Sequence, residues 1–532
     1  MEMSTEKTEE KRWRNMPGQP WAGFASFIRT HFVLAAGMAA FLALVYGEQA
    51  FSNYFYIDKE VFVNNPGTFY NWGETGRFGL VLMNRILGMN WYNPYLGGML
   101  FLAGLWLAAM AAGYLFHFVE RKLTASFLAP FMLLFAVYPT YAELFAFQFV
   151  AYEIVLAMVL LLVSDWYLVR AVRERNRVSF LMSIPFAVIA FGSYQSLVPL
   201  QLCLYLGIFL LYIYAQKGER KAVFSFICHS AVHFIAALGI YELIAKIFFS
   251  GSNYLDTQVL WRTEDWRTCL LYIVRNILHV VTARGAFFTI AYDLCCGIGL
   301  AALVILAIRY RRKAAWYGLG LLGVALSPFY LSFVTGAIPA NRTQIVLPMA
   351  NGVLWLFGSL VISEELKSHW KKAGRGLLVT AGCCMIYLNL MPVMRIFYTR
   401  DVVGKADEAI AAMIVDELND IPSIVSEEKG VIFIGRRPAQ LNNACYTLEE
   451  CWTYVIMSAF ELDYDFEPYY YHSSRRILGF LETLGIWHLS LLDAELLPAA
   501  YEDSEDMPVW PLEGSVREFD DYVIVKLGEN EF

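Results

Sequence analysis

Long apolar stretches are the feature that most restricts the folds open to this 532-residue chain. Residues 32–46 contain no charge, and residues 150–163 contain only Glu153. A helix of about 20 mostly apolar residues covers a hydrocarbon core about 30 Å thick. Backbone amides in lipid must pair within their own segment, so helices are expected. Barrel strands would alternate apolar and polar residues, which these stretches do not.

Eleven segments have the length and composition of membrane spans. The whole chain is 58% hydrophobic and 17% charged, whereas about a quarter of the residues are charged in a typical soluble domain. We therefore expect an all-α polytopic membrane protein with about 11 transmembrane helices. The predicted spans are 29–47, 95–117, 125–141, 148–169, 179–194, 197–215, 223–248, 290–309, 315–335, 345–363 and 376–394.

Lysine and arginine are concentrated in alternate connections between these spans. The basic segments are the N-terminal one and those near 121–122, 170–177, 217–221, 309–313 and 367–375, whereas 138–148 and 191–198 contain neither residue. Basic connections stay on the cytoplasmic side of a membrane. The pattern predicts a multi-pass protein of the cell (plasma) membrane with a cytoplasmic N-terminus and an extracytoplasmic C-terminus.

This orientation divides the chain into three parts. We expect a cytoplasmic segment over 1–28, a transmembrane domain over 29–394, and an extracytoplasmic domain over 395–532. The transmembrane domain has large outer loops at 48–94 and 249–289. The tail is acidic, with 27 Asp and Glu against 8 Lys and Arg from residue 401 onward.

The tail alone has the mixed patterns of a soluble domain. Strand-like runs at 431–434 and 522–526 occur with helical patterns at 403–418 and 474–485, and together they predict a small α/β domain. Cys445 and Cys451 are near neighbours here, so a structural disulfide and two free thiols are both open. No cysteine spacing indicates a zinc site.

The first outer loop contains more candidate catalytic and binding residues than any other connection. Asp58, Glu60, Glu74 and Arg77 lie among aromatic residues shortly after the first span. The stretch 77–87 is apolar on most sides, as in an amphipathic helix lying in the membrane interface. Such a loop can meet a lipid phosphate and a water-borne acceptor together. The alternative is that these acids only solvate the loop.

Three other outer connections supply candidate residues. Glu143 lies in the third connection, where simple hydration is the alternative. Tyr194 and Gln195 lie in a charge-free connection and either hydrogen-bond a sugar or cap helix ends. Arg342 is the only charge of its loop. It suits a phosphate, because a guanidinium binds oxyanions through two N–H groups, although a headgroup anchor is the alternative.

Several short motifs resemble the Gtr type II family of polytopic glucosyltransferases, within the GT-C superfamily. They are Tyr56-Ile57-Asp58, Gly76-Arg77, Ser193-Tyr194-Gln195, Pro339 with Arg342, and the tail runs 507–516 and 522–526. The resemblance covers most of the chain. Relatives often have two adjacent acids in the first loop, whereas Asp58 is followed here by Lys59 and then Glu60. The acidic role therefore falls to Asp58 alone or to Asp58 with Glu60.

The resemblance implies a GT-C-like fold and transfer of a sugar, expected to be glucose, from a polyprenyl-phosphate donor to a cell-surface glycan acceptor. An acceptor hydroxyl needs a carboxylate base, and the departing phosphate needs a fixed cation. Asp58 is assigned as the base, with Glu60 and Glu74 as further catalytic candidates. Arg342 or Arg77 would bind the phosphate, and Glu143, Tyr194 and Gln195 would line the sugar or acceptor site.

The expected partners are thus the lipid donor, the glycan and the bilayer, with no nucleic acid. No Gly-rich phosphate loop follows a strand, so no nucleotide cofactor is expected. No metal ligand is assigned, and a divalent cation shared by Glu60 and Glu74 stays open. Two other functions remain: a multi-pass transporter or lipid flippase, and a non-enzymatic scaffold or receptor.

The orientation makes a direct prediction. A reporter active only outside the cytoplasm should work when fused after Phe532 and fail when fused after Arg312, because basic connections are retained inside. Reporter activity in cells measures both fusions. The reverse pattern would overturn the orientation and every site assignment that depends on it.

Overall fold

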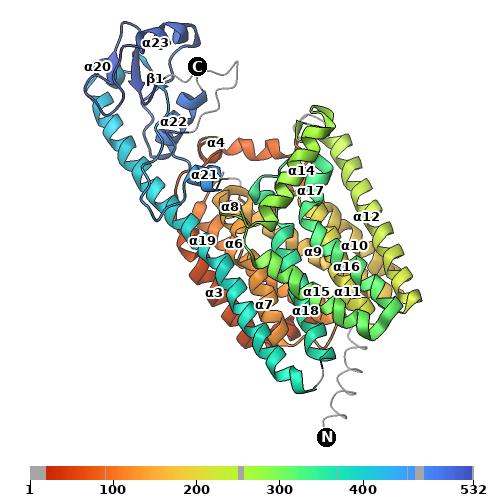
Figure 1. Cartoon of the computed structure of the whole chain (residues 1–532). Helices are drawn as coiled ribbons and strands as arrows, with labels where there is room; N and C mark the ends of the chain where they lie inside the picture. The colour runs from red at the N-terminus through yellow and green to blue at the C-terminus, as the bar shows by residue number, and fades with distance from the viewer. Residues whose placement is uncertain are drawn as a thin grey trace.

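A computed structural model describes residues 20–89, 91–217, 219–249, 257–366, 368–451, 453–461 and 472–529. Most helices stand side by side in one bundle, and a small domain projects from one end (Figure 1). Within the described ranges, nine helices are long and apolar enough to cross a membrane, or ten with one bent pair. The predicted polytopic α-helical fold is confirmed.

The nine candidate spans follow the predicted order. They are α3 (Phe32–Ala50), α6 (Pro94–Val119), α9 (Gln148–Glu174), α11 (Leu197–Ala215), α12 (Arg220–Phe248), α15 (Ala291–Tyr310), the consecutive α16 (Ala314–Leu326), η4 (Ser327–Phe329) and α17 (Tyr330–Thr335), then α18 (Val346–Glu365) and α19 (Ser368–Asn419). The short elements α2 (Pro20–Thr30) and η3 (Arg311–Lys313) flank them. Residues 1–19 of the predicted cytoplasmic segment lie outside the described residues.

Two predicted spans differ from simple transmembrane helices. The segment 125–141 corresponds to α7 (Ala125–Ala136) and α8 (Pro139–Ala146), which meet at a bend of 47°. Pro139 begins α8 and has no backbone N–H to continue the helix before it. The segment 179–194 corresponds to α10 (Arg177–Phe191), whose 15 residues are too few for a core about 30 Å thick. The predicted eleven spans thus become nine or ten.

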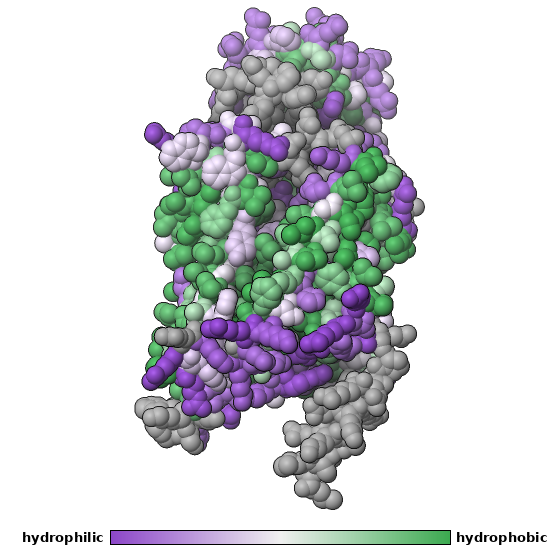
Figure 2. Space-filling view, turned by 90° about the vertical axis from the view of Figure 1, so that its right-hand side faces the viewer, coloured by the Kyte–Doolittle hydropathy of each residue, from purple (hydrophilic) through white to green (hydrophobic). Residues whose placement is uncertain are grey.

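Burial separates the core of the bundle from its lipid-facing rim. The most apolar windows of α9 and α18 are 89% and 94% buried, whereas those of α12 and α19 are each 28% buried. Helices that are apolar all round yet exposed need a non-aqueous solvent. Figure 2 shows the result on one face, a broad apolar band between two polar ends.

Short elements cover the end of the bundle beneath the small domain. The first outer loop forms α4 (Lys59–Asn64), η1 (Pro66–Trp72) and α5 (Phe78–Leu87), and the other loops form η2 (Leu260–Arg262), α14 (Trp266–Val281) and η5 (Asn341–Thr343). The helix predicted over 77–87 is present as α5, which runs across the bundle end (Figure 1). It buries Leu80 and Met83 and exposes Ile86.

The small domain is carried on α19. This helix has 52 residues, or about 78 Å at 1.5 Å per residue, and runs unbroken past residue 394. A three-stranded sheet follows in the order β1-β3-β2, with β1 (Gly430–Ile434) parallel and β2 (Val516–Glu518) antiparallel to β3 (Tyr522–Lys526). The helices are α20 (Pro422–Val425), α21 (Leu448–Cys451), η6 (Tyr454–Ile456), α22 (His472–Thr483), η7 (Ala494–Leu496) and α23 (Leu497–Asp503).

The predicted strands 431–434 and 522–526 are therefore confirmed as β1 and β3, and the predicted helix 474–485 as α22. Cys445 and Cys451 are both free thiols. The disulfide alternative is wrong, and both side chains are instead buried as small apolar groups.

Candidate functional site

Asp58 and Glu60 share one cation from the small domain. Nη2 of Arg476, on α22, lies 3.1 Å from Oδ1 of Asp58, and Nη1 of the same guanidinium donates to Oε1 of Glu60. Asp58 has a φ of 70° immediately before α4, a left-handed conformation that non-glycine residues seldom adopt. This turn directs two carboxylates of the first outer loop toward one arginine.

The two carboxylates differ in exposure. The side chain of Asp58 is 42% exposed and that of Glu60 only 4%. Burial raises the pKa of Glu60 to about 7, outweighing the opposite effect of Arg476. Oε2 of Glu60 is buried without a hydrogen-bond partner. Asp58 is therefore the carboxylate of this pair that a substrate can reach.

A second cluster joins Glu143 of α8 to Arg342 of η5. Nη1 of Arg342 lies 3.5 Å from Oε1 of Glu143, and its guanidinium lies 4.5 Å from the ring centre of Phe147. Glu143 is 2% exposed. The bend between α7 and α8 places Glu143 here. Glu143 and Arg342 were predicted to have separate roles, whereas the structure pairs them.

A third cluster joins Arg77, Tyr194 and Gln195. Nε of Arg77 donates to Oε1 of Gln195 at 3.1 Å, and the guanidinium lies 5.6 Å from the ring centre of Tyr194. The backbones approach closely here, since a Cβ on Gly79 would lie 2.3 Å from Oγ of Ser193. Glu74 lies on an exposed turn before α5.

Aromatic rings connect the second and third clusters. Arg342 lies over Phe147 at one end of the series, and Arg77 lies 4.8 Å from the ring centre of Trp72 at the other. The intervening centroid distances are 5.9 Å for Phe147–Phe149, 4.2 Å for Phe149–Phe62 and 5.8 Å for Phe62–Trp72.

Tyr56, two residues before Asp58, contacts both Phe147 and Phe149. The second and third clusters thus contact one aromatic layer, and the first cluster is joined to it through Tyr56 and Phe62, which flank Asp58 and Glu60 in the chain.

Two buried basic side chains, Arg400 and Lys59, lie near Asp58. Arg400 of α19 is 1% exposed. Its Nη1 donates to Oε1 of Gln49 at 3.1 Å, while Nε and Nη2 have no hydrogen-bond partner. Nζ of Lys59 donates to the carbonyls of Asn53 and Tyr54. Burial, and secondly the nearby Arg400, lower the pKa of Lys59.

Arg400 and Arg476 were not predicted as site residues. Each is more than 300 positions from the first loop, and no local spacing links it to Asp58. The available signal for Arg400 was its position just beyond the last predicted span, where a charge can lie at the membrane interface. Arg476 belongs to the pair Arg475-Arg476, but the tail also contains the pair Arg436-Arg437, so the sequence did not single out Arg476.

The described side chains give no support to a metal centre. Within the ranges that the structure describes, no three His, Cys, Asp or Glu side chains gather to hold an ion. Glu60 is bound to Arg476, and Glu74 lies on its own exposed turn. A divalent cation shared by these two carboxylates thus has no observation in its favour.

A family model described as Glucosyl transferase GtrII matches residues 47–362, more than half of the chain. No curated protein matches. The matched range contains all eight predicted site residues: Asp58, Glu60, Glu74, Arg77, Glu143, Tyr194, Gln195 and Arg342. It ends before Arg400 and Arg476, so Asp58 and Glu60 receive their cation from outside it.

The buried carboxyl of Glu60 predicts a pH-dependent stability. Because the folded pKa is raised to about 7 from a model-peptide value of about 4.3, the folded protein binds more protons than the unfolded protein between these values. Stability should therefore fall as pH rises through this window. We expect Glu60→Gln to flatten this fall, measured as the apparent melting temperature in detergent from pH 5 to 8.

Glu74→Gln is the matched control, because it removes an exposed carboxylate from the same loop. It should keep the wild-type pH profile. An unchanged profile in Glu60→Gln would show that Glu60 does not titrate between pH 5 and 8 and would contradict the prediction.

Proposed function

Because the chain belongs to the Glucosyl transferase GtrII family, we propose that it transfers glucose from polyprenyl phosphate to a cell-surface glycan on the outer face of the membrane. Family membership makes it a membrane glycosyltransferase. The donor, the acceptor and the sidedness are parts of the proposal. The predicted orientation places the small domain and the three clusters outside the cytoplasm.

One observation carries the proposal: an accessible carboxylate lies in the same loop as part of an aromatic layer that contacts two arginine clusters at one end of an apolar bundle. A polyprenyl-phosphate sugar holds its phosphate at headgroup depth while its chain stays in hydrocarbon. A glycan acceptor approaches from water. The end of the bundle is where these two substrates meet.

Asp58 is the proposed general base. As the acceptor oxygen bonds to C1 of the sugar, its hydroxyl proton passes to the Asp58 carboxylate. The bond from C1 to the phosphate oxygen breaks, and polyprenyl phosphate leaves with the electron pair. Arg476 is a positioning residue that fixes the direction of the carboxylate. Glu60 and Glu74 are the other carboxylates that the test must exclude.

Arg342 is the proposed phosphate-binding residue. Its side chain is 28% exposed, and Glu143 and the Phe147 ring hold its guanidinium in place. A fixed cation stabilises the charge that develops on a leaving phosphate. Arg77 is the alternative cation. Glu143, Tyr194 and Gln195, which hold these two arginines, are proposed to line the sugar or acceptor site.

A transporter or flippase would place its polar site near the bilayer midplane between repeated halves. A scaffold would consume no donor. The test uses membranes containing the protein and radiolabelled polyprenyl-phosphate glucose, with mannose and galactose donors in parallel. We expect loss of the glucose donor and release of polyprenyl phosphate. Consumption of none of the donors would contradict the proposal, and donor movement without cleavage would indicate a flippase.

Asp58→Asn should lower transfer by about a hundredfold or more, the scale of general-base catalysis. The amide keeps the shape and still accepts a hydrogen bond from Arg476, but it cannot take a proton. Asp58→Glu should be poor but measurable, since about 1 Å of misplacement is costly. The initial rate of donor consumption measures both variants, and membrane insertion and donor binding should be unchanged.

Glu60→Gln and Glu74→Gln are the comparison variants for Asp58. Near-normal transfer in Asp58→Asn, with loss of transfer in either of the other two, would assign the base to that other carboxylate.

Arg342→Ala should weaken use of the lipid donor, seen as a raised KM for polyprenyl-phosphate sugar. Arg342→Lys should recover part of it, because lysine keeps the charge but loses the two-pronged geometry. Arg77→Ala is measured beside it. An unchanged donor dependence in Arg342→Ala, with a weakened one in Arg77→Ala, would move the phosphate role to Arg77.

A further inference from the structure

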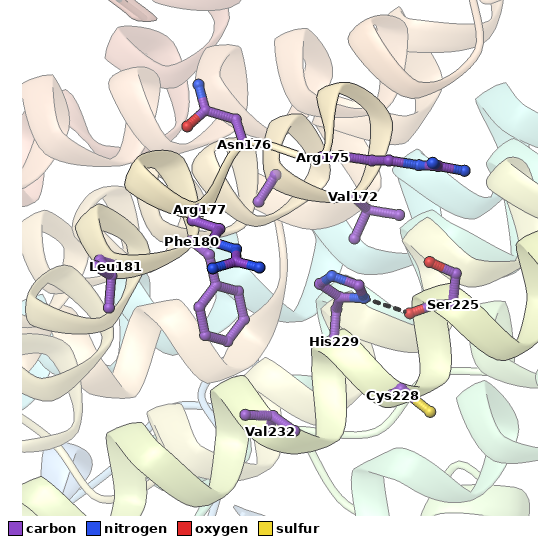
Figure 3. A pocket seen from close by; sticks show the side chains of 11 residues that line it. Val172, Arg175, Asn176, Arg177, Phe180, Leu181, Ser225, Cys228, His229 and Val232 are labelled. Atoms are coloured by element: carbon purple, nitrogen blue, oxygen red, sulfur yellow. Dashed lines mark hydrogen bonds between the residues drawn. The ribbon is translucent and has the colours of Figure 1, made fainter.

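A pocket of about 720 Å³ opens between α9, α10 and α12, at the end of the bundle opposite the candidate site. The end of α9, the turn into α10 and the first turns of α12 line it (Figure 3). This is the end that carries the basic connections. Its volume lies within the range of small-molecule binding pockets.

The polar part of the pocket is cationic. Arg175 and Arg177 line it, and none of the lining residues is an acid. The nearest carboxylate in the sequence, Glu174, accepts a hydrogen bond from Nε of Arg170 at 2.8 Å. His229 is fixed by a hydrogen bond from Nδ1 to the Ser225 carbonyl, and it faces Arg177 across the pocket (Figure 3).

The remaining lining is mostly apolar, apart from Asn176, which caps the start of α10. Phe180 lies against the pocket beside Arg177 (Figure 3). Leu181 and Val232 line it and are 64% and 55% exposed. Both belong to helices at the rim of the bundle, where exposed apolar side chains meet hydrocarbon. The pocket therefore offers cations at one end and an apolar wall at the other.

We propose that this pocket binds an anionic phospholipid of the cytoplasmic leaflet. Its phosphate diester lies at Arg177, opposite His229, and one acyl chain follows Leu181 and Val232 (Figure 3). The Arg175 side chain points away from Arg177 and adds positive charge to the lining (Figure 3). One guanidinium binds two phosphate oxygens through two N–H groups. Basic pockets between helices on the cytoplasmic side suit anionic headgroups. The sidedness rests on the predicted orientation, whereas the binding itself is independent of sugar transfer.

The first test measures lipid selectivity with spin-labelled lipids in reconstituted membranes. Phosphatidylglycerol and phosphatidylcholine of equal chain length are compared by their motionally restricted fractions. We expect the wild type to prefer phosphatidylglycerol. Arg177→Ala should lower that preference about fivefold, since each basic residue near an anionic surface contributes about 1 kcal/mol. Arg175→Ala should lower it less, because the Arg175 side chain points away from Arg177 (Figure 3).

The charge-matched control is Arg220→Ala, which removes one exposed arginine at the start of α12 outside the pocket. This variant should keep the preference. Val232→Trp keeps both pocket arginines and fills the pocket, so it should lower the preference as Arg177→Ala does. Equal losses in Arg220→Ala and Arg177→Ala would mean diffuse surface charge and would overturn the proposal.

A second readout locates the lipid. Cys228 lines the pocket. Replacing part of the phosphatidylcholine by phosphatidylglycerol should slow modification of Cys228 by a neutral maleimide, as read by peptide mass spectrometry. Arg177→Ala should abolish the protection. An unchanged rate in the wild type, or equal protection in Arg177→Ala, would contradict binding in this pocket.

Discussion

The absence of water in the hydrocarbon core is the constraint on which the rest of this structure depends. Backbone groups there must pair within their own helix, and charges are costly. The chain meets this demand with apolar helices whose most buried members, α9 and α18, form the centre of the bundle. Polar chemistry that needs both a lipid phosphate and a water-borne acceptor is then confined to the ends.

The small domain completes the end of the bundle from which it projects rather than standing apart from it. Arg476 reaches Asp58 and Glu60, and Nδ2 of Asn64 donates to Oε2 of Glu482 at 2.6 Å. Helix α22 lies so close to α4 that a Cβ on Gly479 would be 2.9 Å from Cγ of Glu60. The long helix α19 connects the bundle to the small domain and so sets how far from the bundle the contact between α22 and α4 forms.

The same helix supplies Arg400, whose buried guanidinium lies 5.1 Å from the ring centre of Tyr56. Burying a charge is expensive unless polar groups compensate it, and here Gln49 supplies one acceptor. The first loop thus contacts two arginines from later in the chain. Arg400 lies against its Tyr56 ring, and Arg476 pairs with its two carboxylates. This arrangement leaves Asp58 accessible while Glu60, two residues later, is buried.

Hydropathy and charge determined the polytopic fold by themselves, because every membrane helix must satisfy the same local demand for length and apolar composition. The strands and helix of the tail were equally local signals. Tertiary structure alone decided that α10 is too short to span, that α7 and α8 bend, and that Glu143 pairs with Arg342. It also decided that Asp58 takes its cation from Arg476. Such pairings depend on how helices pack across hundreds of residues, and a single sequence carries no periodic signal for that packing.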